Sequence, residues 1–393
     1  MCYDLYHMVS IRFIWYKGMQ NLLLVYPVYP LLFSKAGLSL SQISLLLAIW
    51  SVPVVLLEIP SGVLADRWNR RYLLIISGVL RTLCFTIWLV LPPLFFVFAL
   101  GFLAWGTAEA LSSGAEEALL FDSLKLEGRQ EAFETIYGRG MGTASVAVAL
   151  SCFTGGFVAH RFGFPVVLLS SVVASLVATG IIMGSNEVNL YKEGRKQHSS
   201  LYLLKDALSH ICKKRSVVYM VLLLIIPISL PGILDEYDPL IASSYGLIAT
   251  YVGFWTGGRY LLESLGAFFA RYFSGKRAHV PALLCIAGGI SLLLYALFGQ
   301  VFFLPFYFLF YFFLSSAGVI QENMVQQSIE NQGRSTIHSF ISLATDLHAM
   351  LVFLLLGSLI SIMHIILFIA LYGSLVSFLV FKGQTKTNTM EFQ

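Results

Sequence analysis

Long apolar runs recur along the whole chain and constrain its fold more than any other feature. Runs of about 18 or more apolar residues are long enough to cross the hydrocarbon core of a bilayer as helices. Only 12% of the residues are charged, whereas a typical soluble domain carries about 25%. An outer-membrane barrel would need alternating strands of about ten residues, and these runs are continuous instead. We therefore predict an all-helical membrane protein.

Twelve such runs are separated by short polar segments, which predicts twelve transmembrane helices. Because this number is even, both termini lie on the same side of the membrane. Most Lys and Arg residues lie in alternate loops, and the positive-inside rule places those loops in the cytoplasm. We therefore expect a multi-pass protein of the cytoplasmic (inner) membrane with both termini cytoplasmic. The predicted spans are residues 13–34, 42–64, 72–92, 94–119, 139–159, 164–185, 216–234, 247–270, 280–298, 300–321, 337–358 and 361–381.

One long basic connection, residues 186–215, separates the sixth predicted span from the seventh. We expect this cytoplasmic linker to lie on the anionic inner leaflet, because Lys and Arg outnumber the acidic residues in it. The linker divides the chain into a six-helix bundle over residues 1–185 and a second six-helix bundle with a short tail over residues 216–393. The segments that begin at Glu58 and Glu263 resemble each other, and this faint repeat indicates two related halves.

A charge-dense turn follows the second predicted span and runs from Gly62 to Arg71. Such charge is excluded from a bilayer core, so the turn lies at a membrane face. The turn resembles the signature loop between the second and third helices of the major facilitator superfamily, with Asn69 in place of a second Gly. Because Asn tolerates the left-handed backbone conformation, we expect the turn to survive this change. The matching residues are Gly62, Asp66, Arg67, Arg70, Arg71 and Leu74.

Two further stretches resemble the drug-efflux-like, proton-antiporter branch of that superfamily. Residues 57–62 read Leu-Glu-Ile-Pro-Ser-Gly, and residues 112–124 follow a pattern of that branch with Phe121 in place of Tyr. The glycine motif of its fifth span is kept here only in part, at Gly155 and Gly156. The resemblance implies a secondary transporter in which two six-helix bundles give alternating access to a substrate near the membrane midplane.

The same resemblance implies a group of residues that closes the cytoplasmic gate, which we call the charge lock. Asp122 falls at the cytoplasmic end of span four, within reach of the arginines of the signature loop. In a gating role these ion pairs break when the cavity opens inward, whereas ordinary salt bridges would only set the geometry of the loop. The predicted members are Gly62, Asp66, Arg67, Arg70, Arg71 and Asp122.

Ionisable side chains at membrane depth are costly, and they tend to mark pathways or buried pairs. Arg81 and Glu109 each lie roughly 14 Å from the cytoplasmic ends of antiparallel spans, at about 1.5 Å per residue, so we predict an ion pair. This pair is either static or exchanges one partner for a proton or a substrate. Glu58 is a proton-binding candidate or a helix-end hydrogen-bonding group, and Asp346 resembles a span-eleven acid that contacts the signature loop in some members. The proton-coupling candidates are Glu58, Glu109, Arg81 and Asp346.

Polar and aromatic side chains in several spans are candidates to line the substrate cavity, which spans one, four, seven and ten line in the superfamily. Arg259 and Glu263 share one helical face at i,i+4 spacing, and they can also simply neutralise each other. The acids Asp235, Glu236 and Asp238 form a solvated helix end or attract cations. Aromatic residues of span ten stack on a ligand or face lipid. The cavity candidates are Asn21, Tyr26, Glu109, Arg259, Glu263, Tyr307 and Tyr311.

These observations predict proton-coupled export of a small amphipathic compound, such as a drug, metabolite or siderophore, by alternating access. The alternatives are an importer of a nutrient, sugar or organic anion, and a non-transporting membrane receptor or scaffold. The sequence contains no Walker motif, no catalytic Ser/His or Cys/His set and no strongly basic soluble domain, so we expect neither an enzyme nor a nucleic-acid-binding protein. We expect no cofactor or metal, and a monomer whose partners are its small-molecule substrate, protons and the lipid bilayer.

Overall fold

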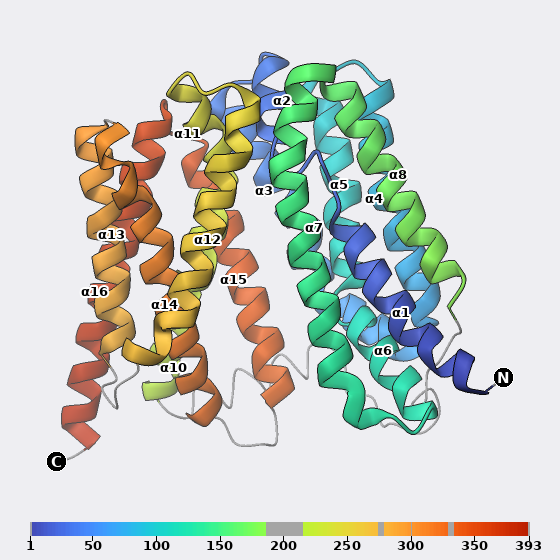
Figure 1. Cartoon of the computed structure of the whole chain (residues 1–393). Helices are drawn as coiled ribbons and strands as arrows, with labels where there is room; N and C mark the ends of the chain where they lie inside the picture. Colours follow the sequence, from blue (N-terminus) through green and yellow to red (C-terminus); the bar gives the residue numbers. More distant parts are fainter. Residues whose placement is uncertain (1, 186–214, 274–278, 300, 329–333, 392–393) are drawn as a thin grey trace. The chain divides into compact units, whose positions relative to one another are not determined.

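The computed structural model describes residues 2–185, 215–273, 279–299, 301–328 and 334–391, which form helices and short connections without a strand (Figure 1). Within these ranges, nine helical segments are long and apolar enough to cross a membrane. The three other predicted spans correspond to α1 (Cys2–Asn21) with α2 (Tyr29–Lys35), to α12 (Ala249–Phe273) and to α15 (Arg334–Leu356). The protein is an all-helical membrane protein with twelve spans, as predicted.

The chain divides into two compact units. The first comprises Met1–Gln197 with Gly246–Phe254, and the second comprises His198–Tyr245 with Trp255–Gln393. The predicted linker lies outside the described residues except for Arg215, where α10 begins. The first unit also contains α3 (Leu40–Arg67), α4 (Arg70–Val90), α5 (Phe95–Ser112), α6 (Ala115–Leu126), η1 (Gln130–Ala132), α7 (Phe133–Phe162) and α8 (Phe164–Met183). The second contains α10 (Arg215–Asp235), α11 (Asp238–Ser244), α13 (Val280–Phe298), η2 (Val301–Phe303), α14 (Leu304–Ser328) and α16 (Ile362–Glu391).

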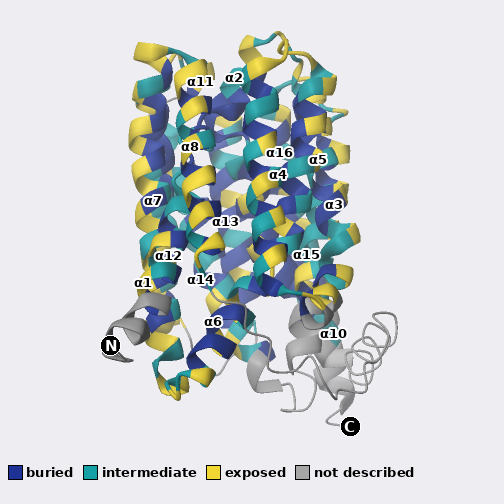
Figure 2. Cartoon of the chain, turned by 90° about the vertical axis from the view of Figure 1, so that its right-hand side faces the viewer, coloured by how far each residue is buried: buried dark blue, intermediate teal, exposed yellow. Residues whose placement is uncertain are grey.

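Each unit buries one side of its helices and leaves an apolar side exposed. In the first unit α5 packs on α3 and α4, while α1 packs on α7 and α8. In the second unit α13 packs on α14 and α16. Exposed residues follow the outer edge of α7 (Figure 2), where Val146, Leu150, Phe153 and Phe157 recur at helical spacing and are all exposed. Such an apolar face is suited to lipid contact.

Two predicted spans are broken in the first unit, and a third is continued by a separate short helix in the second. The first span ends as α1 at Asn21 and resumes as α2 at Tyr29, so its prolines accompany a break and not only a bend. In the gap, the backbone N–H of Val25 donates to Oγ of Ser171 at 3.1 Å, which satisfies a backbone group that has no helical partner at membrane depth. The fourth span breaks between α5 and α6, where Gly114 has a φ of +70°, a conformation that glycine adopts at little cost. After the seventh span, α11 follows α10 with only two residues between them.

Local capping explains where two of the helices begin. Ser39 and Gln42 form a reciprocal capping box at the start of α3, which satisfies two N–H groups at the helix end. Asn69 caps α4 by accepting a hydrogen bond from the N–H of Tyr72 at 2.9 Å. Its φ is −75°, so the expected left-handed conformation is wrong. Asn69 fits the signature turn because its side chain caps the next helix.

Three pairs of corresponding helices in the two units begin at one common offset. An offset of 209 residues relates the first residues of α2 and α11 (Tyr29 and Asp238), of α3 and α12 (Leu40 and Ala249), and of α5 and α14 (Phe95 and Leu304). The same offset relates Gly37 and Gly246, which both have positive φ. At this offset Glu263 corresponds to Val54, so the pairing of Glu58 with Glu263 in the sequence repeat is wrong. The halves are related, as predicted, but in a different register.

Candidate functional site

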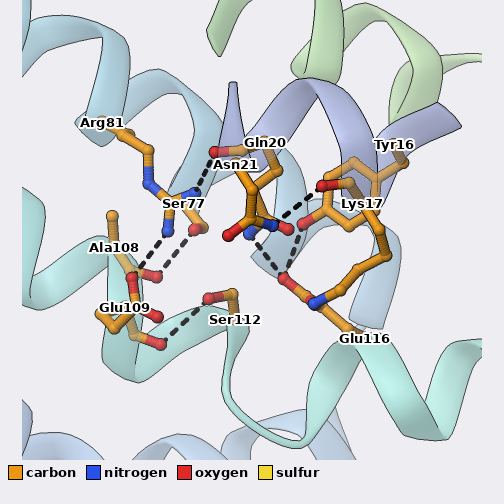
Figure 3. Close-up of polar contacts among 10 residues, drawn as sticks. All are labelled: Tyr16, Lys17, Gln20, Asn21, Ser77, Arg81, Ala108, Glu109, Ser112 and Glu116. Carbon is orange, nitrogen blue, oxygen red and sulfur yellow. Dashed lines mark hydrogen bonds and ion pairs between the residues drawn. The ribbon is translucent and has the colours of Figure 1, made fainter. Parts of the chain in front are cut away.

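A polar cluster joins α1, α4, α5 and α6 inside the first unit (Figure 3). Its first part is Glu116, in the first turn of α6, which receives three contacts from α1. The hydroxyl of Tyr16 donates to Glu116 at 2.8 Å, the Gln20 amide donates at 2.6 Å, and Nζ of Lys17 lies 2.7 Å away. Three donors from α1 thus converge on one carboxylate at the N-terminus of α6. Glu116 therefore ties α1 to the helix that follows the break at Gly114.

The second part of the cluster is the predicted ion pair between Arg81 and Glu109, which the structure contains. Nη2 of Arg81 lies 2.7 Å from Oε2 of Glu109, and Nη1 donates to the carbonyl oxygen of Gln20 at 3.4 Å. Gln20 lies in the last turn of α1, where a positive charge is favoured by the helix dipole. The Arg81 side chain is 7% exposed, whereas that of Glu109 is 48% exposed. Glu109 is therefore the accessible member of the pair, and Arg81 is the buried member.

The structure contains one ion pair between residues predicted to form the charge lock. Arg70 is buried and pairs with Asp122, and it also donates to the carbonyl oxygens of Ala65 and Ala118 at 3.2 Å. Arg71 donates instead to the carbonyl oxygen of Met183 at the end of α8. The side chains of the other two charged members, Asp66 and Arg67, lie outside the described residues. Gly62 is exposed, and open space surrounds the position of an added Cβ.

The remaining first-unit candidates and Asp346 lie in separate places. Asn21 ends α1 and donates to the carbonyl oxygen of Lys17 at 2.8 Å. Tyr26 lies in the gap between α1 and α2, with its ring 6.5 Å from that of Tyr29. Glu58 is half-buried late in α3, and Asp346 is half-buried in α15.

Sequence reasoning missed the contacts of Glu116. The pattern of the efflux-like branch over residues 112–124 contains a glutamate, and this glutamate aligns with Glu117. The Glu117 side chain is exposed, whereas the neighbouring Glu116 makes the contacts with α1. The sequence does place three donors close together, because Tyr16, Lys17 and Gln20 lie within about one turn of a helix. This spacing could have indicated a shared acceptor.

An ionic cluster surrounds Arg259 in the second unit. The Arg259 side chain is 2% exposed, and it pairs with three carboxylates from α10, α11 and α12. Nη2 lies 2.7 Å from Oδ1 of Asp235, Nε lies 2.9 Å from Oδ2 of Asp238, and Nη1 lies 2.8 Å from Oε2 of Glu263. The predicted i,i+4 pair is thus one part of a larger cluster, and Asp238 is buried, which a solvated helix end does not explain.

Aromatic hydrogen-bond donors complete this cluster. The hydroxyl groups of Tyr307 and Tyr311 donate to Oδ1 of Asp238, and the indole N–H of Trp255 donates to the same atom at 3.4 Å. The Tyr260 ring centroid lies 3.7 Å from the guanidinium carbon of Arg259, a favourable cation–π distance. Tyr307 and Tyr311, predicted to line the cavity, are fully buried and face this carboxylate.

Comparison with known proteins agrees with this architecture. The family model of the Major Facilitator Superfamily matches residues 18–353. An uncharacterized transporter of Buchnera aphidicola is 23% identical over 202 residues, and the match spans about half of this chain and half (48%) of that relative.

Solved transporter structures show the same fold at low sequence identity. The nucleoside transporter NupG is 11% identical, with 97% of this chain and 99% of that chain covered and a TM-score of 0.74. The POT family transporter PepTSo is 11% identical, with coverage of 97% and 98% and a TM-score of 0.75. A D-xylose–proton symporter is 14% identical, with coverage of 98% of each chain and a TM-score of 0.67. These relatives are membrane transporters and not enzymes. The chain belongs to the major facilitator superfamily.

Proposed function

We propose that this protein is a proton-coupled secondary transporter that exports a small amphipathic compound across the cytoplasmic membrane by alternating access. In this proposal it works as a monomer with both termini cytoplasmic, within the drug-efflux-like branch. The observation that carries the proposal is the pair of buried Arg81 and half-exposed Glu109 within membrane spans. A charged carboxylate that meets water at membrane depth can accept a proton or contact a polar group of a substrate.

The charge lock supports the alternating part of the proposal. Arg70 joins the start of α4 to Asp122 on α6 through a buried ion pair. The pair holds the start of α4 to α6, and in this proposal it breaks when the cavity opens toward the cytoplasm. Asp66 and Arg67 are proposed as further members, and Glu58 and Asp346 remain proton-binding candidates.

One observation favours a second candidate, uptake of an organic anion. Arg81 donates to a carbonyl oxygen in the last turn of α1 as well as pairing with Glu109. If Glu109 turns toward water, the helix end still favours the positive charge of Arg81. An anionic group of a substrate can then take the place of the carboxylate.

Transport by purified protein in proteoliposomes tests these proposals. An imposed pH gradient is combined with a panel of amphipathic cations, neutral compounds and organic anions. We expect gradient-driven transport of an amphipathic compound by the unaltered protein and its loss in Glu109→Gln. Glu134→Gln, an exposed residue in the first turn of α7, serves as the matched control and retains activity. Unchanged gradient-driven transport in both Glu58→Gln and Glu109→Gln contradicts the assigned proton sites, and inward transport of anions alone favours the second candidate.

A further inference from the structure

The carboxylates around Arg259 outnumber the positive charges that the described structure places beside them. Asp238 is fully buried and receives donors from Trp255, Tyr307 and Tyr311 in addition to its ion pair. These contacts tie the Asp238 carboxylate to Arg259 and to the three aromatic donors. The side chain of Glu263, on the other edge of the guanidinium, is 34% exposed. The three carboxylates carry more negative charge than the guanidinium neutralises, and Glu263 is the exposed member of this group.

The buried polar atoms of the cluster are held by ion pairs. Nε of Arg259 lies 2.9 Å from Oδ2 of Asp238, and Nη2 lies 2.7 Å from Oδ1 of Asp235. Three carboxylates thus surround one guanidinium. This excess of negative charge indicates that the cluster takes up a further positive species.

Neutralising a carboxylate has different consequences at the two buried arginines. A proton on Glu109 neutralises the carboxylate that pairs with Arg81. The positive charge of Arg81 then remains beside the carbonyl oxygen of Gln20 in the last turn of α1. Protonation of Glu109 therefore calls for another group beside Arg81, such as an anionic group of a substrate, because a buried charge without an ionic partner is costly. A proton on Glu263 leaves Arg259 paired with Asp235 and Asp238, so it relieves repulsion among the acids without stranding the arginine.

We propose that the cluster around Arg259 binds one proton, which enters when the Glu263 carboxylate becomes a neutral carboxylic acid. The proton comes from water that reaches the exposed edge of Glu263, and it returns to water on release. The inference deepens the proposed function, because it places a coupling proton in the second unit.

The other charged and titratable groups near Glu263 are those that an experiment has to control. Arg259 lies on the same helix, and acidic groups face it from α10 and α11. Tyr311 on α14 approaches the guanidinium from another side. The groups are Asp235, Glu236, Asp238, Arg259, Tyr260, Tyr307 and Tyr311.

Infrared difference spectroscopy tests proton binding without a substrate. Spectra of the full-length protein in lipid nanodiscs are compared at neutral and acidic pH, and the C=O stretching band of protonated carboxyl groups is followed. We expect a band that is lost in Glu263→Gln and retained in Glu109→Gln and Glu134→Gln. Glu263→Asp, which keeps the carboxylate, is expected to retain the band at a shifted midpoint, and helix content by circular dichroism shows that the variants are folded.

The outcomes separate this inference from the proposed function. An unchanged band in folded Glu263→Gln, or an Asp variant without a shift, overturns proton binding at Glu263. A band that disappears when NaCl replaces KCl at the same pH shows a Na⁺ site and also overturns it. Absence of transport by the unaltered protein contradicts the proposed function alone, since the infrared band needs no transport. If both proposals hold, Glu263→Gln loses gradient-driven transport but keeps exchange of labelled for unlabelled substrate.

Discussion

The short helix α2 of the first unit and its counterpart α11 in the second unit are packed in two different ways. In the first unit Tyr29 of α2 lies among aromatic rings, with centroids 5.3 Å from Phe33, 5.6 Å from Phe102 and 6.2 Å from Trp105. The position 209 residues later is Asp238, and the position that corresponds to Phe102 is Tyr311. An apolar aromatic core in one unit thus corresponds to a hydrogen-bonded ionic cluster in the other.

This difference shows that the helix arrangement does not require buried charge. The first unit forms the same pattern of helices around rings, and a buried ion pair is often no more stable than apolar residues of similar volume. The charges around Arg259 therefore have to be explained by what they do. Proton binding is the explanation that we propose.

Removing one arginine from each unit should give the largest and most unequal effects. Arg259→Met leaves Asp238 buried without its counter-charge, and breaking a buried pair in this way costs about 3–5 kcal/mol. Arg81→Met leaves Glu109 half exposed to water, so its cost should be nearer 1 kcal/mol. Thermal unfolding in detergent measures both variants. Equal losses of stability would contradict the contrast between the two units.

Replacing the whole cluster by apolar residues should separate stability from function. Because Arg259 and its three paired carboxylates are removed together, stability should stay the same or rise by about 1–4 kcal/mol, while gradient-driven transport is lost. Unfolding temperature and proteoliposome transport measure the two effects, and a folded variant with intact coupling would refute a role for the cluster. The combined substitutions are Asp235→Leu, Asp238→Leu, Arg259→Met, Glu263→Met, Tyr307→Phe and Tyr311→Phe.

Breaking the charge lock should shift the gate of the first unit. Asp122→Asn removes the ionic partner of Arg70, and loss of a hydrogen bond between charged groups costs about 1.5–3 kcal/mol. About 1.4 kcal/mol changes a two-state population tenfold. Labelling of a cysteine placed near the start of α4 or the end of α6 should therefore become about ten- to hundredfold faster. An unchanged rate would mean that the pair only sets the geometry of the loop.

Two adjacent glutamates provide the smallest and most sharply matched comparison. Glu116→Gln weakens three contacts with α1 and should cost about 1–2 kcal/mol. Glu117→Gln changes an exposed side chain and should stay within about 0.5 kcal/mol. Unfolding temperatures of the two variants test this order, and the reverse order would favour the alignment of Glu117 with the branch pattern over the observed contacts.

The sequence was sufficient to predict the spans and one ion pair, but not the breaks or the clusters. Hydropathy identifies apolar length, and helical rise is enough to place Arg81 opposite Glu109. Hydropathy did not identify the break at Gly114, because the predicted span runs past this residue to residue 119. The cluster of Asp238 and Arg259 brings together α10, α11, α12 and α14, and local spacing showed only its i,i+4 pair. Tertiary packing decides such contacts.

Simultaneous recording of proton and substrate flux in proteoliposomes tests the central claim, that proton movement drives transport, most directly. A pH-sensitive dye inside the vesicles and a labelled substrate report both fluxes in one sample. Proton-coupled export predicts that substrate and protons move in opposite directions. It also predicts that Glu263→Gln abolishes the substrate-dependent proton flux. Equal substrate flux with and without the pH gradient, with no movement of protons, would contradict it.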